Sequence, residues 1–153
     1  MKTFLWGISA LILLAIFMGW STYKSYKPAP PDLEVIVDKH AVKIKAVTYS
    51  FRKWGRTAVA DANTEPALLV REDSPMEVNT SGRIELLFEK SPDSVTCYLW
   101  DMETGSLAYP GLEGLPLDIE QSNVSSGDYA MEIRAKWEDG YVLYYARIYV
   151  NED

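Results

Sequence analysis

The sequence has very few residues of the kinds that form crosslinks or bind transition metals. Its 153 residues include one cysteine, Cys97, and one histidine, His40. One cysteine excludes an intramolecular disulfide, and zinc sites need several His or Cys ligands. Cys97 lies in a strand-like run, residues 95–100, so we expect it to be a small buried apolar residue. We expect no metal, no cofactor and a fold stabilised by an apolar core.

Patterns typical of catalysis are also scarce. A Ser-His-Asp triad would have to use His40, and the chain has no Gly-x-Ser-x-Gly elbow. No glycine-rich phosphate loop is present. Carboxylates are plentiful, but none of them matches an EF-hand loop, so turn residues in solvent are the simpler interpretation. The sequence therefore predicts a protein that is not an enzyme, with no catalytic residue.

Acidic residues are missing from the start of the chain. None precedes Asp32, so all 22 Asp and Glu residues lie in the later part, together with 12 of the 15 Lys and Arg residues. This part carries a net charge of −10, which repels nucleic acid and anionic head groups. We expect no nucleic-acid partner. The negative charge could attract cations or basic partners. The simpler interpretation is that it only keeps the domain soluble.

An uncharged apolar run extends from Phe4 to Trp20 and is bounded by Lys2 on one side and by Lys24 and Lys27 on the other. A helix needs about 17–25 apolar residues to cross the hydrocarbon core of a bilayer. The run therefore predicts that residues 4–20 contact the membrane and that residues 1–24 form a transmembrane signal anchor. The expected location is the cell membrane, single-pass, with the N-terminus inside and the C-terminal domain extracytoplasmic.

A cleaved signal peptide is the alternative interpretation of residues 1–24. Gly19-Trp20-Ser21 places small residues at both positions that a cleavage site requires. Cleavage near Ser21 would give a secreted protein. No cysteine follows the apolar run, which excludes a lipid-modified N-terminus.

A proline-rich segment, residues 25–32, separates this region from the rest of the chain. Proline favours extended polyproline geometry, so the segment is expected to be a short, semi-rigid tether. Residues 33–153 are then one extracytoplasmic domain in which strand signals dominate. The predicted strands are residues 33–37, 42–49, 83–89, 95–100 and 117–120. Residues 57–62 suggest a helical turn, 67–70 a short or edge strand, and 106–116 a loop.

The clearest local pattern is at the C-terminus. Apolar and polar residues alternate from Tyr129 to Trp137 and again from Val142 to Val150, and Asp139-Gly140 lies between the two runs. This pattern predicts a β-hairpin. Tyr129 fits the tyrosine corner of immunoglobulin-like domains, with Met131 in the usual cysteine position. The predicted fold is an all-β, immunoglobulin-like antiparallel β-sandwich preceded by one transmembrane helix.

Three segments, residues 47–54, 127–137 and 140–150, resemble small exported surface proteins of Bacillus and related Gram-positive bacteria. The resemblance covers roughly residues 45–150. It implies one immunoglobulin-like domain at the cell surface and no assigned activity. Many of those proteins are lipoproteins, whereas this chain lacks the cysteine that would carry the lipid.

Aromatic residues are the remaining feature, with 15 Trp and Tyr residues in the chain. By alternation, Tyr141, Tyr145 and Tyr149 share one face of the last strand, opposite its core face. Such a stripe can bind sugars, peptides or proteins, although cross-strand aromatics also simply stabilise sheets. We predict a membrane-tethered binding or scaffolding domain with a protein or cell-wall-polymer partner. The alternative is a carbohydrate- or cell-wall-polymer-binding module that uses these tyrosines.

Overall fold

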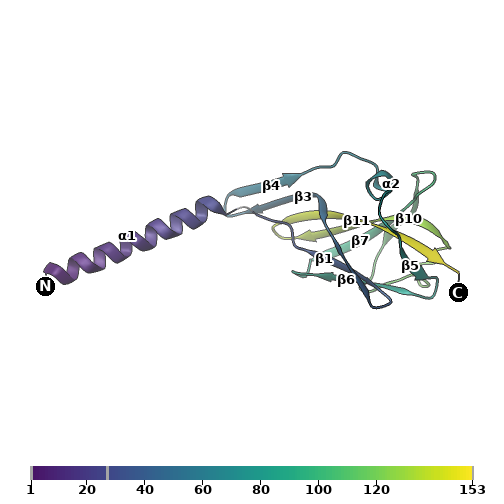
Figure 1. Cartoon of the computed structure of the whole chain (residues 1–153), viewed down its shortest axis with the longest axis horizontal. Helices are drawn as coiled ribbons and strands as arrows, with labels where there is room; N and C mark the ends of the chain where they lie inside the picture. The colour runs from purple at the N-terminus through teal and green to yellow at the C-terminus, as the bar shows by residue number, and fades with distance from the viewer. Residues whose placement is uncertain (1, 27, 153) are drawn as a thin grey trace.

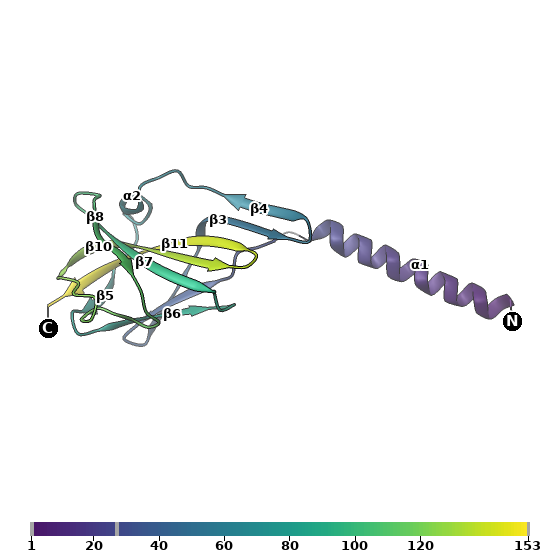
Figure 2. The same ribbon diagram turned by 180° about the vertical axis from the view of Figure 1, so that it is seen from behind.

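The computed structural model describes residues 2–26 and 28–152, and for residues 2–10 it describes the backbone alone. A long helix, α1 (Lys2–Ser25), precedes a domain built of strands. Figure 1 shows the helix projecting from one end of this domain, with the C-terminus at the opposite end. Figure 2 gives the same arrangement from behind.

The strands form two mostly antiparallel sheets, so the predicted β-sandwich is confirmed. The smaller sheet has the order β2-β1-β6-β9, with β1 (Leu33–Val37), β2 (His40–Ile44), β6 (Arg83–Phe88) and β9 (Leu117–Asp118). The larger sheet has the order β4-β3-β11-β10-β7-β8, with β3 (Ala46–Lys53), β4 (Arg56–Ala60), β7 (Ser94–Asp101), β8 (Leu107–Leu112), β10 (Gly127–Trp137) and β11 (Gly140–Asn151). A further strand, β5 (Met76–Asn79), pairs in parallel with β11.

The core lies between the two sheets, because alternate residues of each strand face inward. Leu33, Val35 and Ile84 of the smaller sheet are fully buried. They belong to the same apolar cluster as the inner residues of the larger sheet. Those residues are Cys97, Leu99, Met131, Ile133, Ala135, Trp137, Val142, Tyr144, Ala146, Ile148 and Val150. The prediction that Cys97 is a small buried residue is confirmed.

The C-terminal hairpin forms as predicted. β10 and β11 pair continuously from Gly127↔Val150 to Trp137↔Gly140, and two residues connect them. Gly140 opens β11 opposite Phe51 of β3. A Cβ at this position would lie 2.0 Å from the carbonyl oxygen of Ser50, so the close approach of β3 requires glycine here.

One predicted strand is in fact two. Residues 42–49 divide at Lys45 into the end of β2 and the start of β3. β2 pairs with β1 in the smaller sheet, and β3 pairs with β11 in the larger one. The chain therefore crosses between the layers within a run that looks continuous in sequence.

Two short assignments in the middle of the chain are wrong. Residues 57–62, expected as a helical turn, belong largely to β4, which pairs with β3. Residues 67–70, expected as a strand, belong mostly to a short helix, α2 (Pro66–Leu69). Pro66 is at the first turn of α2, where a missing N–H costs nothing and the fixed φ favours a helix.

The segment expected as a loop contains a strand, β8, at the edge of the larger sheet. Pro110 lies within it and cannot donate a backbone hydrogen bond. The pairing of β8 with β7 shifts register near this point. An edge position tolerates both features, because one side of an edge strand needs no partner.

α1 exposes apolar side chains along its described half, from Leu11 to Trp20. In the part of the chain whose side chains are described, no helix reaches the length and apolarity that a membrane span requires. The predicted apolar run begins at Phe4, so its first seven residues lie outside the side chains that are described.

The tether packs against the domain instead of standing off as a spacer. Pro28 is buried, and the hydroxyl of Tyr144 donates a hydrogen bond of 2.6 Å to the carbonyl oxygen of Pro31. The backbone N–H of Glu89 donates to the carbonyl oxygen of Asp32 at 3.0 Å. Residues 28–32 are therefore fixed to the sandwich before β1 begins.

Replacing Trp137 by alanine tests the core. Its ring is 2% exposed, packs against Phe51 and Phe88, and donates from Nε1 to the carbonyl oxygen of Lys90 at 3.0 Å. We expect Trp137→Ala to lower the free energy of unfolding by about 3–5 kcal/mol in a urea titration followed by circular dichroism. Leu87→Ala, at a surface position, should change it by less than about 0.5 kcal/mol. Equal effects would contradict this core.

Candidate functional site

β11 positions all three tyrosines proposed as a binding stripe. Its burial alternates as expected, with even-numbered residues from Val142 to Val150 in the core and odd-numbered residues on the outer face. Tyr141 and Tyr149 are the most exposed of the three tyrosines, at 46% and 41%. Eight residues of extended chain separate them by about 26 Å. One ligand would therefore have to be long to reach both rings.

Tyr141 borders a shallow hollow of about 560 Å³ on the outer face of β7, β10 and β11. The guanidinium of Arg134 lies 4.0 Å above the ring of Tyr98 on one side of this hollow. Arg134 also pairs with the carboxylate of Glu132. Two aromatic rings and a positive charge thus meet at the end of the sheet nearest the β10–β11 turn.

Tyr145 is not part of an open stripe, because α2 and the residues after it cover it. It packs with Ala67 and Val70 in a small apolar cluster on the outer face, which also includes Ala130 and Trp100. Figure 2 shows α2 lying over this side of the larger sheet. Burial raises the pKa of the Tyr145 hydroxyl to about 12, so the side chain stays neutral.

Arg147, two residues further along β11, ties the α2 segment to the sheet. Its guanidinium forms two hydrogen bonds with the carboxylate of Asp128, at 3.1 and 2.7 Å. Nη1 also donates to the carbonyl oxygens of Arg71 and Asp73, at 2.9 and 3.3 Å. One side chain therefore joins β10, β11 and the loop after α2. Tyr149 lies beyond this junction, at the far end of β11.

Glu132 is a buried carboxylate that sequence reasoning placed on a solvent face. It is 3% exposed, and Oε2 accepts a hydrogen bond of 3.1 Å from Nε1 of Trp100. Arg134 satisfies the other oxygen. Glu132 alternates with the core residues of β10 and so lies on the outer face, but alternation alone does not show that Trp100 and Arg134 cover it there.

β11 lacks a neighbouring strand over three residues on one side. Its pairing with β3 ends at Tyr144↔Ala46, and its pairing with β5 begins at Ile148↔Met76. Within the described chain, no strand pairs with residues 145–147 on this side. The gap arises because the chain before Ala46 belongs to β2 of the smaller sheet, so β3 reaches β11 only as far as Tyr144, and β5 pairs with β11 only from Ile148 onward.

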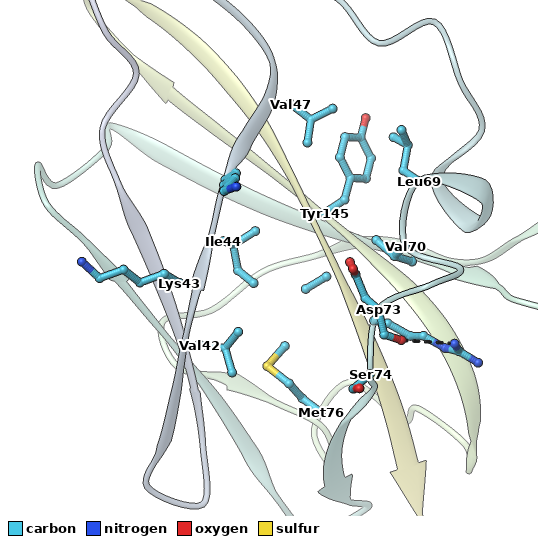
Figure 3. Close-up of a pocket in the computed structure, with 13 residues that line it drawn as sticks. Val42, Lys43, Ile44, Val47, Leu69, Val70, Asp73, Ser74, Met76 and Tyr145 are labelled. Atoms are coloured by element: carbon cyan, nitrogen blue, oxygen red, sulfur yellow. Dashed lines mark hydrogen bonds between the residues drawn. The ribbon is translucent and has the colours of Figure 1, made fainter.

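A cavity of about 520 Å³, here called the edge groove, occupies this gap. Its floor is the unpaired part of β11, and Figure 3 shows its walls coming from two directions. On one side lie residues of β2 and the start of β3, and on the other lie residues of α2 and the following loop. The apolar lining residues are Val42, Ile44, Val47, Leu69, Val70, Met76 and Ala146, and the ring of Tyr145 lies at one end.

The edge groove is an apolar cavity beside an unpaired part of a strand. Its described lining residues are not arranged as a set that could break a bond. Among the described residues, no three His, Cys, Asp or Glu side chains gather where a metal ion could bind. Cys97 is remote in the core, where burial raises its thiol pKa to about 12. His40 lies exposed at the start of β2, with Nδ1 3.2 Å from the carbonyl oxygen of Asp38.

Comparison of the chain with protein-family models, curated proteins and solved structures gives no match.

Replacing Arg147 by alanine tests its role in holding α2. We expect amide hydrogen exchange over residues 66–75 to become about tenfold faster, because the loop loses the hydrogen bonds that fix it to β11. Mass spectrometry of deuterated peptides measures this change. Arg83→Ala is the control, because Arg83 forms its ion pair with Asp118 in the other sheet. Unchanged exchange in the Arg147 variant would show that packing alone holds α2.

Proposed function

We propose that this chain is a non-enzymatic, membrane-tethered extracytoplasmic domain that binds a segment of a partner protein. The observation that carries the proposal is the edge groove, where an apolar cavity opens beside three residues of β11 that lack a strand neighbour. Extended peptides bind such places by pairing with the strand edge while their side chains enter the apolar walls. The groove is long enough for a few residues of such a strand.

The tether in this proposal is α1, which spans the bilayer. Its large apolar side chains from Leu11 to Trp20 are about 55–70% exposed. A helix that is apolar on all sides is stable in lipid and costly in water. Trp20 and Tyr23, near the end of the helix, suit the lipid–water boundary. The acidic domain then lies outside the cytoplasm.

Retention of α1 is favoured over cleavage near Ser21. Residues just after this site pack against the domain: the hydroxyl of Tyr23 donates to the carbonyl oxygen of Trp54 at 3.1 Å. Nη1 of Arg56 donates to the carbonyl oxygen of Lys24 at 2.9 Å. A cut at Ser21 would separate these contacts from the helix that orders them.

We further propose that the sandwich is of the immunoglobulin-like type. The hydroxyl of Tyr129 donates to the carbonyl oxygen of Ser125, four residues upstream, at 3.2 Å. This matches the tyrosine corner of that fold, in which the bond returns to the backbone a few residues earlier. Met131, two residues later, is fully buried where such domains carry a core cysteine.

Sugar binding is a second candidate, favoured by the hollow beside Tyr141. The exposed ring of Tyr141, the partly buried ring of Tyr98, the Arg134 guanidinium and nearby hydroxyls are a combination that can hold a polysaccharide. The wider stripe contributes less, since Tyr145 is half-buried under α2 and Tyr149 lies at the far end. This site would engage a cell-wall polymer near the base of the domain.

The tether is tested by adding charge to α1. We expect the full chain to remain with membranes during alkaline carbonate extraction and to float with them in a density gradient. Ile12→Arg with Leu14→Arg should release it, because each charge in mid-bilayer costs about 2.5–3.5 kcal/mol. Arginine at Leu68 and Leu87, on the surface of the domain, is the matched control. An unmodified chain found in the soluble fraction would contradict the tether.

The groove is tested by photo-crosslinking in intact membranes. A photoreactive amino acid at Lys45, an exposed residue at the groove, should give a crosslink to one short apolar segment of a partner, identified by mass spectrometry. Val42→Glu should abolish the adduct, because its carboxylate enters the apolar wall. Leu87→Glu, at an exposed position of β6 outside the groove lining, should not.

A different pattern would favour the sugar-binding candidate. In that case the Lys45 probe gives no adduct that depends on Val42. Purified cell-wall fragments then bind the full chain, and Tyr141→Ala abolishes the binding. Circular dichroism of each variant shows whether the sandwich remains folded.

A further inference from the structure

The turn between β3 and β4 places a large aromatic ring in solvent. Trp54 and Gly55 form this turn, both with positive φ, of 51° and 71°. Two-residue turns of this kind favour Asn-Gly or Gly-Gly, because a bulky residue at positive φ is strained. The Trp54 side chain is nevertheless 62% exposed. The strained backbone at Trp54 does not stabilise the core, because the ring that it carries is in solvent. Residues with strained backbone angles cluster at functional positions.

The same turn is joined to the end of α1. The carbonyl oxygen of Trp54 accepts the hydrogen bond from Tyr23, and its ring lies 4.6 Å from the ring of Tyr26. Arg56 caps the helix, because Nη1 donates to the carbonyl oxygens of Lys24 and Tyr26 at 2.9 and 3.0 Å. Its guanidinium also lies 4.9 Å above the ring of Tyr23. Figures 1 and 2 both show this hairpin meeting the helix end.

The charge of this hairpin is opposite to that of the domain. Residues 46–60 contain three Lys or Arg residues and no Asp or Glu, whereas residues 31–153 have a net charge of −10. Arg52 and Lys53 are both exposed, and Nζ of Lys53 lies 5.6 Å from the Trp54 ring. On the neighbouring β10–β11 turn, the carbonyl oxygen of Asp139 accepts a hydrogen bond from the backbone N–H of Arg52 at 2.8 Å, and its carboxylate pairs with Lys90 at 3.5 Å. The β3–β4 turn extends past that turn toward α1.

From these contacts between the end of α1 and the β3–β4 turn, we infer that the turn is a lipid-binding element. Arg52 and Lys53 bind the phosphates of anionic head groups, and Trp54 inserts between the head groups. The inference rests on the proposed tether. Trp20 at the hydrocarbon boundary puts Tyr26 about 9 Å higher, at 1.5 Å per residue of helix. The head-group layer is about 5–8 Å thick, so Trp54, against Tyr26, lies at the outer edge of this layer, next to the head groups. Tryptophan and basic residues are the side chains that this layer favours.

The test follows one position of the hairpin in lipid nanodiscs. The full chain with Thr57→Cys is labelled with a fluorophore, and a quencher is attached to the lipid head groups. Cys97 stays unlabelled, because it is 1% exposed and its thiol pKa is raised. The nanodiscs contain either phosphatidylcholine alone or phosphatidylcholine with phosphatidylglycerol. We expect quenching to increase at least about twofold with the anionic lipid, since each basic residue near such a surface adds about a fivefold preference.

Charge reversal identifies the residues responsible. Arg52→Glu with Lys53→Glu should abolish the response to phosphatidylglycerol, as should high salt. Lys39→Glu with Arg71→Glu changes the net charge equally at exposed positions away from the hairpin and should leave the response intact. A label at Glu103, in the turn between β7 and β8, should show little quenching in either lipid.

Two failures are distinguishable. A chain that does not enter the nanodiscs contradicts the proposed tether. A chain that enters them, but whose Thr57 label responds equally to both lipids or equally in both charge-reversed variants, overturns the lipid-binding hairpin and leaves the tether standing.

Discussion

The rest of the structure depends on the pairing of β11. This strand pairs with β10 over its whole length, with β3 over its first part and with β5 over its last part. Its two-residue period commits every second side chain to the core, from Val142 to Val150. A shift of one residue would put the tyrosines and Arg147 inside and the apolar residues outside. The register therefore fixes the core, the outer face and the position of the gap together.

The gap beside β11 follows from how the neighbouring strands are shared between layers. β3 begins beside β11 only at Ala46, because the chain before it belongs to the smaller sheet, and β5 reaches β11 only four residues further along. The α2 segment closes the outer side of this region, and Arg147 holds it there through Asp128 and two backbone carbonyls. The edge groove thus follows from the order of the strands in the two sheets. This order leaves part of the edge of β11 unpaired beside exposed apolar side chains.

Local patterns predicted the parts of the fold that local forces determine. The C-terminal hairpin, β1, the strands around Arg83 and Cys97, and the buried state of Cys97 are all confirmed, because alternation and a turn signal specify them within about ten residues. The division at Lys45 is not visible in sequence, since both halves have strand composition and only their partners differ. Residues 67–70 have strand-like composition, but Pro66 before them suits the first turn of a helix, and this signal is the one that the structure follows.

The candidate sites were predicted less completely than the fold. Alternation placed Tyr141, Tyr145 and Tyr149 on one face correctly, but it carries no information on what covers that face. Tyr145 packs against a segment some 75 residues earlier in the sequence, and Glu132 is buried with hydrogen bonds to Trp100 and Arg134. The edge groove depends on three separate strands and a helix, so no short motif encodes it. The positive φ of Trp54 likewise follows from the length of the turn, which the sequence did not reveal.

The capped junction at Arg56 has a mechanical consequence. The end of α1 is joined to the β3–β4 turn by hydrogen bonds and by two aromatic rings in contact, so the helix and the sandwich are expected to tilt together. About eight residues of extended chain, roughly 26 Å, separate the Trp54 turn from the level of Tyr145. With α1 in a bilayer, an average tilt of about 20° swings that level sideways by about 9 Å. Bilayer thickness, which sets the tilt, would then set how far the groove reaches toward neighbours in the same membrane.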